Sequence, residues 1–124
     1  MGAGAVYTRW PRELYARNDD VALSTTGQTT LLQWTDQVTS TYEISVSGYV
    51  ANATTALTVA IQYTDAAAPS AGAQIRYIFD DDNLVVGGFD GARRIRVYGG
   101  TAVTVTATAG TAGNVTLSAE AVRS

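Results

Sequence analysis

Residues 42–64, YEISVSGYVANATTALTVAIQYT, decide the fold, because two runs of alternating residues flank a short polar break. In each run, apolar or aromatic side chains occupy nearly every second position, and polar or small side chains lie between them. A strand places successive side chains on opposite faces, so each run predicts a strand with one buried and one wetted face. The polar residues 52–55 predict the turn that joins the two strands.

Segments of the same kind surround this central pair. The sequence predicts further short strands over residues 21–25, 29–34, 74–79, 92–98, 101–109 and 115–122, bounded by Gly, Asn, Asp, Ser or Pro. Residues 65–72 and 80–91 are expected to be long surface loops. About eight short strands predict an all-β fold, a single antiparallel β-sandwich with either a jelly-roll or an immunoglobulin-like arrangement.

The composition limits the chemistry that the chain can carry. Its 124 residues are the size of one compact domain, and a hydrophobic content of 46% is enough for a single core. The sequence has no cysteine, which excludes disulfides and thiolate chemistry. It also has no histidine, the usual base of a nucleophilic triad and the commonest transition-metal ligand. We therefore expect a protein that is not an enzyme and that needs no cofactor.

Charge is distributed unevenly along the chain. Residues 1–18 contain three arginines and one carboxylate, whereas the chain from Asp19 onward contains five arginines and ten carboxylates. The body is therefore acidic, with a sequence pI of about 4.6, which argues against nucleic acid as a partner. No apolar run approaches the roughly 20 residues of a membrane span, and the start lacks a signal-peptide pattern. We expect no membrane association, and synthesis in the cytoplasm.

Residues 1–18 differ from the rest because no strand or helix period runs through them. We interpret them as an extended N-terminal arm with one helical turn over residues 11–16, followed by a sandwich domain over residues 19–124. The arm mixes aromatic residues with arginine, the types enriched among interface anchors. The residues expected to contact a partner are Tyr7, Arg9, Trp10, Arg12, Tyr15 and Arg17. The alternative is that the arm folds back on its own domain as an edge strand or lid.

Two charged groups in the body allow more than one interpretation. The consecutive aspartates Asp80, Asp81 and Asp82 either help to bind calcium or form a solvated acidic turn, and their spacing differs from that of an EF-hand loop. The arginines 93, 94 and 96 clamp an anion, pair with acidic residues of a neighbouring subunit, or act as surface charges that guard an edge strand.

The aromatic residues of the body also allow two interpretations. Trp34, Tyr49 and Tyr98 form a platform for a sugar ring, or Trp34 ends a buried strand and the two tyrosines are exposed or lie in a subunit interface. No carboxylate pair of the kind that a glycosidase uses stands out at the strand ends. The residues expected at a subunit interface are Tyr49, Ile78, Arg94, Arg96 and Tyr98.

A family resemblance rests on two segments of the chain. They are STYEISVSGYVANATTALTVAIQYTDA over residues 40–66 and RIRVYGGTAVTVTATAGTAGNVTLSAEAVRS over residues 94–124. They resemble a recurrent small all-β domain of tailed-bacteriophage structural proteins, through the strand pattern and the motifs YTDA and GGTAVTV. The resemblance covers residues 20–122 and excludes the arm. It implies a jelly-roll-like sandwich, usually trimeric, on the virion as a capsid decoration (cement) protein or at a fibre tip, with no catalytic motif.

From the resemblance and the arm together, we expect a homotrimer on the virion surface that binds the major capsid protein. The arm is expected to bridge adjacent capsid subunits, while the acidic body projects outward. The alternative is a fibre-tip domain that binds a host receptor or glycan through residues 65–72 and 80–91. A third hypothesis is a carbohydrate-binding module that accompanies an enzyme.

Overall fold

The computed structural model describes residues 13–24 and 27–123, which form eight strands and one short helical turn. The strands are β1 (Glu13–Ala22), β2 (Thr29–Thr35), β3 (Ser40–Val50), β4 (Thr55–Thr64), β5 (Ala73–Leu84), β6 (Gly87–Val97), β7 (Ala102–Ala109) and β8 (Val115–Arg123). The 3₁₀ turn η2 (Pro69–Ala71) lies between β4 and β5. Within these residues no helix is long and apolar enough to cross a membrane.

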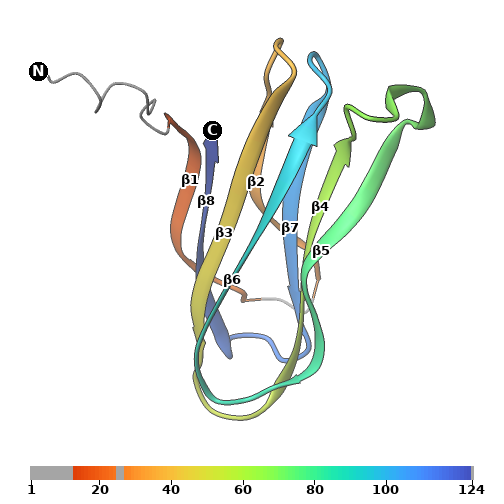
Figure 1. The fold of residues 1–124 in the computed structure, drawn as a ribbon. Coiled ribbons are helices and arrows are strands. Elements are labelled where there is room, and N and C mark those ends of the chain that lie inside the picture. Colours follow the sequence, from red (N-terminus) through yellow and green to blue (C-terminus); the bar gives the residue numbers. More distant parts are fainter. Residues whose placement is uncertain (1–12, 25–26, 124) are drawn as a thin grey trace, which may run out of the picture.

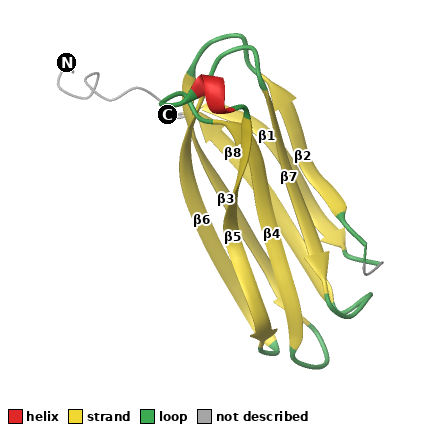
Figure 2. Ribbon diagram, turned by 90° about the vertical axis from the view of Figure 1, so that its right-hand side faces the viewer, coloured by secondary structure: helices red, strands yellow, loops and turns green. Residues whose placement is uncertain are grey.

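The strands form two four-stranded sheets that pack face to face (Figure 1 and Figure 2). One sheet has the order β1-β8-β3-β6 and the other β2-β7-β4-β5, and neighbouring strands are antiparallel. Consecutive strands lie in different sheets, except β4 and β5. This order is that of a jelly roll, so the expected antiparallel sandwich is confirmed and the immunoglobulin-like alternative is wrong.

The central stretch supplies much of the core, as its alternation predicts. The inward side chains of β3 and β4 are all buried, namely Tyr42, Ile44, Val46, Val50, Leu57, Val59, Ile61 and Tyr63. Together with the inward residues of β7 and β8 they form one apolar core between the sheets. Gly48 continues the inward row of β3, where a Cβ atom would lie 2.4 Å from the Thr116 carbonyl oxygen. The core therefore leaves no room for a side chain at this position.

Strand β1 starts earlier than the sequence predicts. Glu13 pairs with Arg123 of β8, so the expected arm boundary at residue 18 falls inside a strand. The helical turn expected over residues 11–16 is wrong for residues 13–16. Register shifts interrupt the pairing of β1 with β8 at two places, between Leu14 and Ala16 and again farther along. These irregularities break the two-residue alternation, which is why the sequence shows no strand period there.

Residues 80–91, expected to be a loop, are instead mostly strand. Strands β5 and β6 are joined by Val85 and Val86, and each strand is the edge of its own sheet. Asp and Gly are depleted in strands, so a segment rich in them is read as a loop. Aspartates in the second half of β5 and glycines in the first half of β6 therefore hid these parts of the two strands, whereas residues 74–79 and 92–98 were predicted as strand.

A bulge redirects the side chains of β5. The pairing of β5 with β4 shifts between Tyr77 and Phe79. Ile75 and Tyr77 face outward and are 54% and 44% exposed. Ile78 and Phe79, in contrast, are half-buried and pack against the core. The bulge thus places two large apolar side chains on the surface of the sheet.

Side-chain hydrogen bonds tie the two sheets together along their open sides. On one side Asn18 Nδ2 donates to the Leu31 carbonyl oxygen over 3.0 Å, which links β1 to β2. On the other side Arg93 Nε donates to the Tyr77 carbonyl oxygen over 3.0 Å, which links β6 to β5. Each bond gives a polar group at the margin of the sandwich a partner in the opposite sheet.

The two outer surfaces of the sandwich differ in charge. Strands β2, β7 and β4 contain no acidic or basic residue, whereas every strand of the other sheet contains charged residues. We call the outer surface of β2-β7-β4-β5 the neutral face and the outer surface of β1-β8-β3-β6 the charged face. The neutral face includes Thr30, Gln33, Thr58, Ala60, Gln62, Ile75, Tyr77, Thr104, Thr106 and Thr108. Its edge strand β5 also contains charged residues, and one of them, Asp80, is the register partner of Thr58 at the margin of this face.

The start of β1 and the end of β8 lie at one end of the sandwich, and the connection between β5 and β6 lies at the other (Figure 1). Strand β1 begins beside the end of β8, because Glu13 pairs with Arg123. Val85 and Val86 form the β5–β6 connection at the far end and are 68% and 46% exposed.

Candidate functional site

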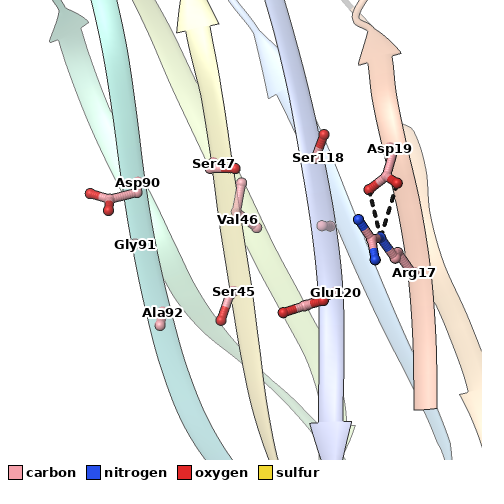
Figure 3. A pocket seen from close by; sticks show the side chains of 11 residues that line it. Arg17, Asp19, Ser45, Val46, Ser47, Asp90, Gly91, Ala92, Ser118 and Glu120 are labelled. Carbon is pink, nitrogen blue, oxygen red and sulfur yellow. Dashed lines mark hydrogen bonds and ion pairs between the residues drawn. The ribbon is translucent and has the colours of Figure 1, made fainter. Parts of the chain in front are cut away.

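The charged face is hollowed near its centre (Figure 3). Two adjoining hollows of about 380 and 580 Å³ share Ser47, Asp90 and Ser118, and we call this continuous depression the trough. It crosses β6, β3 and β8 and reaches β1. The depression exists because small residues of three neighbouring strands lie side by side. These residues are Ser45, Ser47, Gly48, Gly88, Gly91, Ala92, Thr116 and Ser118.

Polar groups line the margins of the trough. On β1, Arg17 Nε lies 2.9 Å from Asp19 Oδ2, and this hydrogen bond, with the Asp19 charge, raises the pKa of Arg17. Glu120 of β8 is the register partner of Arg17, and in Figure 3 its side chain points away from Arg17, toward β3. Asp90 lies on β6 at the opposite margin. The trough therefore offers several carboxylates and one arginine that is already paired.

One end of the trough is aromatic. Tyr49 lines it and is 54% exposed. Hydroxyl and carboxylate groups around an exposed aromatic ring are the groups that bind a sugar, because they accept hydrogen bonds from its hydroxyls while the ring packs on its apolar side. Among residues 13–24 and 27–123, no group of three or more acidic side chains is placed to hold a metal ion.

A second polar cluster surrounds Asp36, in the connection between β2 and β3. The carboxylate accepts hydrogen bonds from the Tyr42 hydroxyl at 2.5 Å, the Ser40 hydroxyl at 3.1 Å and the Val38 backbone N–H at 3.1 Å. Arg123 Nη1 lies 3.1 Å from Asp36 Oδ2. These hydrogen bonds, that of Tyr42 first, hold the pKa of Asp36 below its usual value. Because its polar atoms already have protein partners, this cluster is structural.

Aromatic rings pack beside Asp36. The ring centroids of Tyr15, Trp34 and Tyr42 lie 5.2–6.0 Å apart in tilted and edge-to-face pairs. Burial raises the pKa of Tyr42 to about 12, with a further contribution from its hydrogen bond to Asp36. Trp34 is half-buried near the end of β2, so it packs inside the domain and does not join Tyr49 or Tyr98 in a platform.

The structure describes two of the six predicted arm contacts. Tyr15 and Arg17 belong to β1, where Tyr15 packs against the core and Arg17 borders the trough. The position of Tyr15 agrees with the alternative interpretation, in which this part of the chain folds back on its own domain. The other four residues lie outside the described part, and their role stays a prediction. They are Tyr7, Arg9, Trp10 and Arg12.

The residues predicted for a subunit interface do not gather in one place. Tyr49 pairs with Gly88 near one end of β3, whereas Tyr98 follows β6 at the other end. Arg94 and Arg96 lie on β6 and face outward, opposite Glu43 and Thr41 of β3. Ile78 is half-buried against its own core. Whether another subunit contacts these residues stays a prediction.

The consecutive aspartates Asp80, Asp81 and Asp82 lie on the edge strand β5 and are exposed. Asp81 Oδ1 accepts a hydrogen bond from the Asn83 backbone N–H at 2.9 Å. Adjacent residues of a strand point to opposite sides, so this segment does not collect its carboxylates around one point. The cluster is a solvated part of the strand.

Sequence reasoning did not identify the trough. The alternation of β3 marks Ser45 and Ser47 as outward-facing, but that signal does not distinguish a hollow from a flat surface. The hollow depends on the pairing of β3 with both β6 and β8, which brings Asp90 and Ser118 beside Ser47. The alternate serines Ser45 and Ser47, followed by Gly48, were the available signal in the sequence.

Comparisons with protein-family models and with curated proteins find no match. Among solved structures, a chain from the structure of infectious bursal disease virus Gt strain is 11% identical with a TM-score of 0.50, covering 90% of this chain and 33% of that chain. A chain of the infectious bursal disease virus VP2 subviral particle is 16% identical with a TM-score of 0.49, at the same coverage. This protein therefore spans about a third of the length of these viral chains, and the similarity is one of fold.

Proposed function

We propose that the protein is a virion structural protein, specifically a capsid decoration (cement) protein that bridges adjacent subunits of the major capsid protein. The observation that carries the proposal is the fold, because its eight-stranded jelly roll aligns over 90% of this chain with a chain from a virus structure. The resemblance to tailed-bacteriophage structural proteins supports the more specific role, the virion-surface location and a homotrimer. The protein acts by binding and not by catalysis.

In this proposal residues 1–12 provide the main contact with the capsid. They contain Tyr7, Arg9, Trp10 and Arg12 and no carboxylate, in a chain that is otherwise acidic. They connect to the sandwich at Glu13, beside the end of β8. Twelve extended residues reach about 40 Å, which is far enough to contact a neighbouring capsid subunit.

The test is co-sedimentation with capsids that lack this protein, prepared from the phage that encodes it. The deletion removes residues 1–12 and not 1–18, because Glu13 starts β1 and Tyr15 packs against the core. The truncated chain is expected to stay folded and to lose capsid binding. A matched pair of variants is Trp10→Ser, expected to weaken binding, and Val38→Ser, which changes an exposed apolar residue of the body and is expected to leave binding intact. Unchanged sedimentation of the truncated chain would overturn the arm's role.

The trough favours a second candidate function, recognition of a host glycan at a fibre tip. In this case Ser45, Ser47 and Ser118 contact the sugar hydroxyls and Tyr49 packs against the ring. Ser47→Trp fills the trough, whereas Thr58→Trp adds the same side chain to the neutral face as a control. If this function is correct, only Ser47→Trp abolishes binding to an array of bacterial surface oligosaccharides, and deletion of residues 1–12 has no effect.

A further inference from the structure

We infer that the neutral face is the surface through which one copy of this chain packs against a second copy. This surface is distinct from the arm, the trough and the residues predicted for a subunit interface. It lies on the outer side of the sheet β2-β7-β4-β5.

The first argument is charge. Exposed surfaces of soluble domains generally carry about 25–35% charged residues, which keep the molecules apart. The three strands β2, β7 and β4 carry no charged residue, although the chain as a whole has a formal net charge of −3. Two copies of an acidic protein meet with least repulsion through the centre of such a face, because its carboxylate Asp80 lies at the β5 margin, beside Thr58.

The second argument is shape. Register places Thr106 between Thr30 of β2 and Ala60 of β4, and it places Thr104 between Gln33 and Gln62 in the next row. Threonine and alanine are short side chains, so only the two glutamines project from the middle of the face. At the β5 margin the row of Gln62 ends in Ile75 and the row of Ala60 ends in Tyr77, whereas the row of Thr58 ends in Asp80. A centre of mostly short side chains beside two exposed hydrophobic residues suits close contact with a second sheet, and tyrosine is a residue type enriched in interfaces.

The third argument is size. Four strands about 4.8 Å apart and about eight residues long present roughly 500 Å² of area. Two copies therefore bury about 1,000 Å² in total, which is the lower limit for a specific protein–protein interface. The face is large enough to hold a pair of copies together, although with moderate affinity.

The experiment measures the mass of the full-length protein by light scattering over a range of concentrations. The wild type is expected to form an oligomer that dissociates on dilution. Thr106→Lys places a charge at the centre of the face, and repulsion between the copies is expected to raise the dissociation constant at least a hundredfold. Thr41→Lys is the matched control, because Thr41 is also a half-buried outward position of a central strand, but on the charged face and outside the trough. It is expected to leave the mass unchanged.

Thermal unfolding of each variant shows whether it is folded. If Thr106→Lys does not fold, Gln62→Lys tests the same face at an exposed position. A wild type that stays monomeric up to about 100 µM, or a folded Thr106→Lys variant that keeps the wild-type mass, overturns the inference. Self-association without capsid binding would overturn the proposed decoration function and leave this inference intact.

Discussion

Arg123 Nη1, at the end of β8, lies 3.1 Å from Oδ2 of the buried Asp36, in the connection between β2 and β3. The contact joins the last described strand to a loop that is far away in the sequence, at the end of the sandwich where β1 begins. Since Asp36 also accepts hydrogen bonds from Tyr42, Ser40 and Val38, one carboxylate organises this end of the fold.

Asp36→Asn is expected to lower the free energy of unfolding by about 1–3 kcal/mol at pH 7. The amide replaces one acceptor oxygen by a donor, which then faces donors from Tyr42 or Arg123. Urea denaturation measures the change. Asp90→Asn, on the charged face, is the control and is expected to change stability by less than about 0.5 kcal/mol. Equal stability of the two variants would contradict a structural role for Asp36.

Acid is expected to destabilise the protein through the same carboxylate. The pKa of Asp36 is lower in the folded chain than in the unfolded chain, so below the usual carboxyl pKa the unfolded chain binds the proton first. The stabilisation is therefore complete above about pH 4 and is lost as the pH falls through the folded-state pKa. Denaturation curves between pH 5 and pH 2 test this expectation. The free energy of unfolding should change less with pH in Asp36→Asn than in the wild type. If it changes equally in both, other groups cause the acid sensitivity.

Alkali is expected to act through Tyr42. Its pKa rises to about 12 in the folded protein, so between pH 10 and 12 the unfolded chain releases the phenol proton first. Stability is unaffected by this group below about pH 10 and decreases by up to about 3 kcal/mol as the pH approaches 12. Unfolding monitored by circular dichroism should show a smaller alkaline loss in Tyr42→Phe than in the wild type. Tyr63, whose pKa burial also raises, supplies a remaining alkaline effect in that variant.

Gly48→Ala is expected to lower the free energy of unfolding by about 1–3 kcal/mol. The added Cβ would lie 2.4 Å from the Thr116 carbonyl oxygen and 2.7 Å from Phe89 Cζ, so β8 and β6 must shift to admit it. Gly88→Ala is the control, since the nearest atom to its Cβ is 3.8 Å away, in ordinary contact. Thermal unfolding of both variants measures the difference. If both substitutions lower the free energy of unfolding by the same amount, close packing at Gly48 does not explain the loss.

The sequence predicted the elements whose side chains alternate regularly. These elements are β3, β4, β7 and β8, and each of them pairs in a regular register with at least one neighbouring strand. The residues that the alternation predicts to face inward are the buried ones. The alternation follows from one buried and one exposed face, so it is visible without knowledge of the neighbouring strands.

The sequence predicted the irregular strands only in part. Two register shifts hide β1, and the bulge near Tyr77 turns Ile75 outward in β5. These features depend on the partner strand, because a bulge is a mismatch between two chains. The trough was missed for a related reason, since Asp90 and Ser118 meet Ser47 only after β3 has paired with both neighbours.

The two-residue connection between β5 and β6 makes the protein suited to carrying a foreign epitope. Val85 and Val86 are exposed and lie at the end of the sandwich opposite the start of β1 and the end of β8 (Figure 1). A peptide inserted between them projects from the end opposite Glu13, so in the proposed decoration role anchoring and presentation would occupy opposite ends of one small domain. Because the flanking strands lie at the edges of the two sheets, the insertion also leaves the central strand pairs intact.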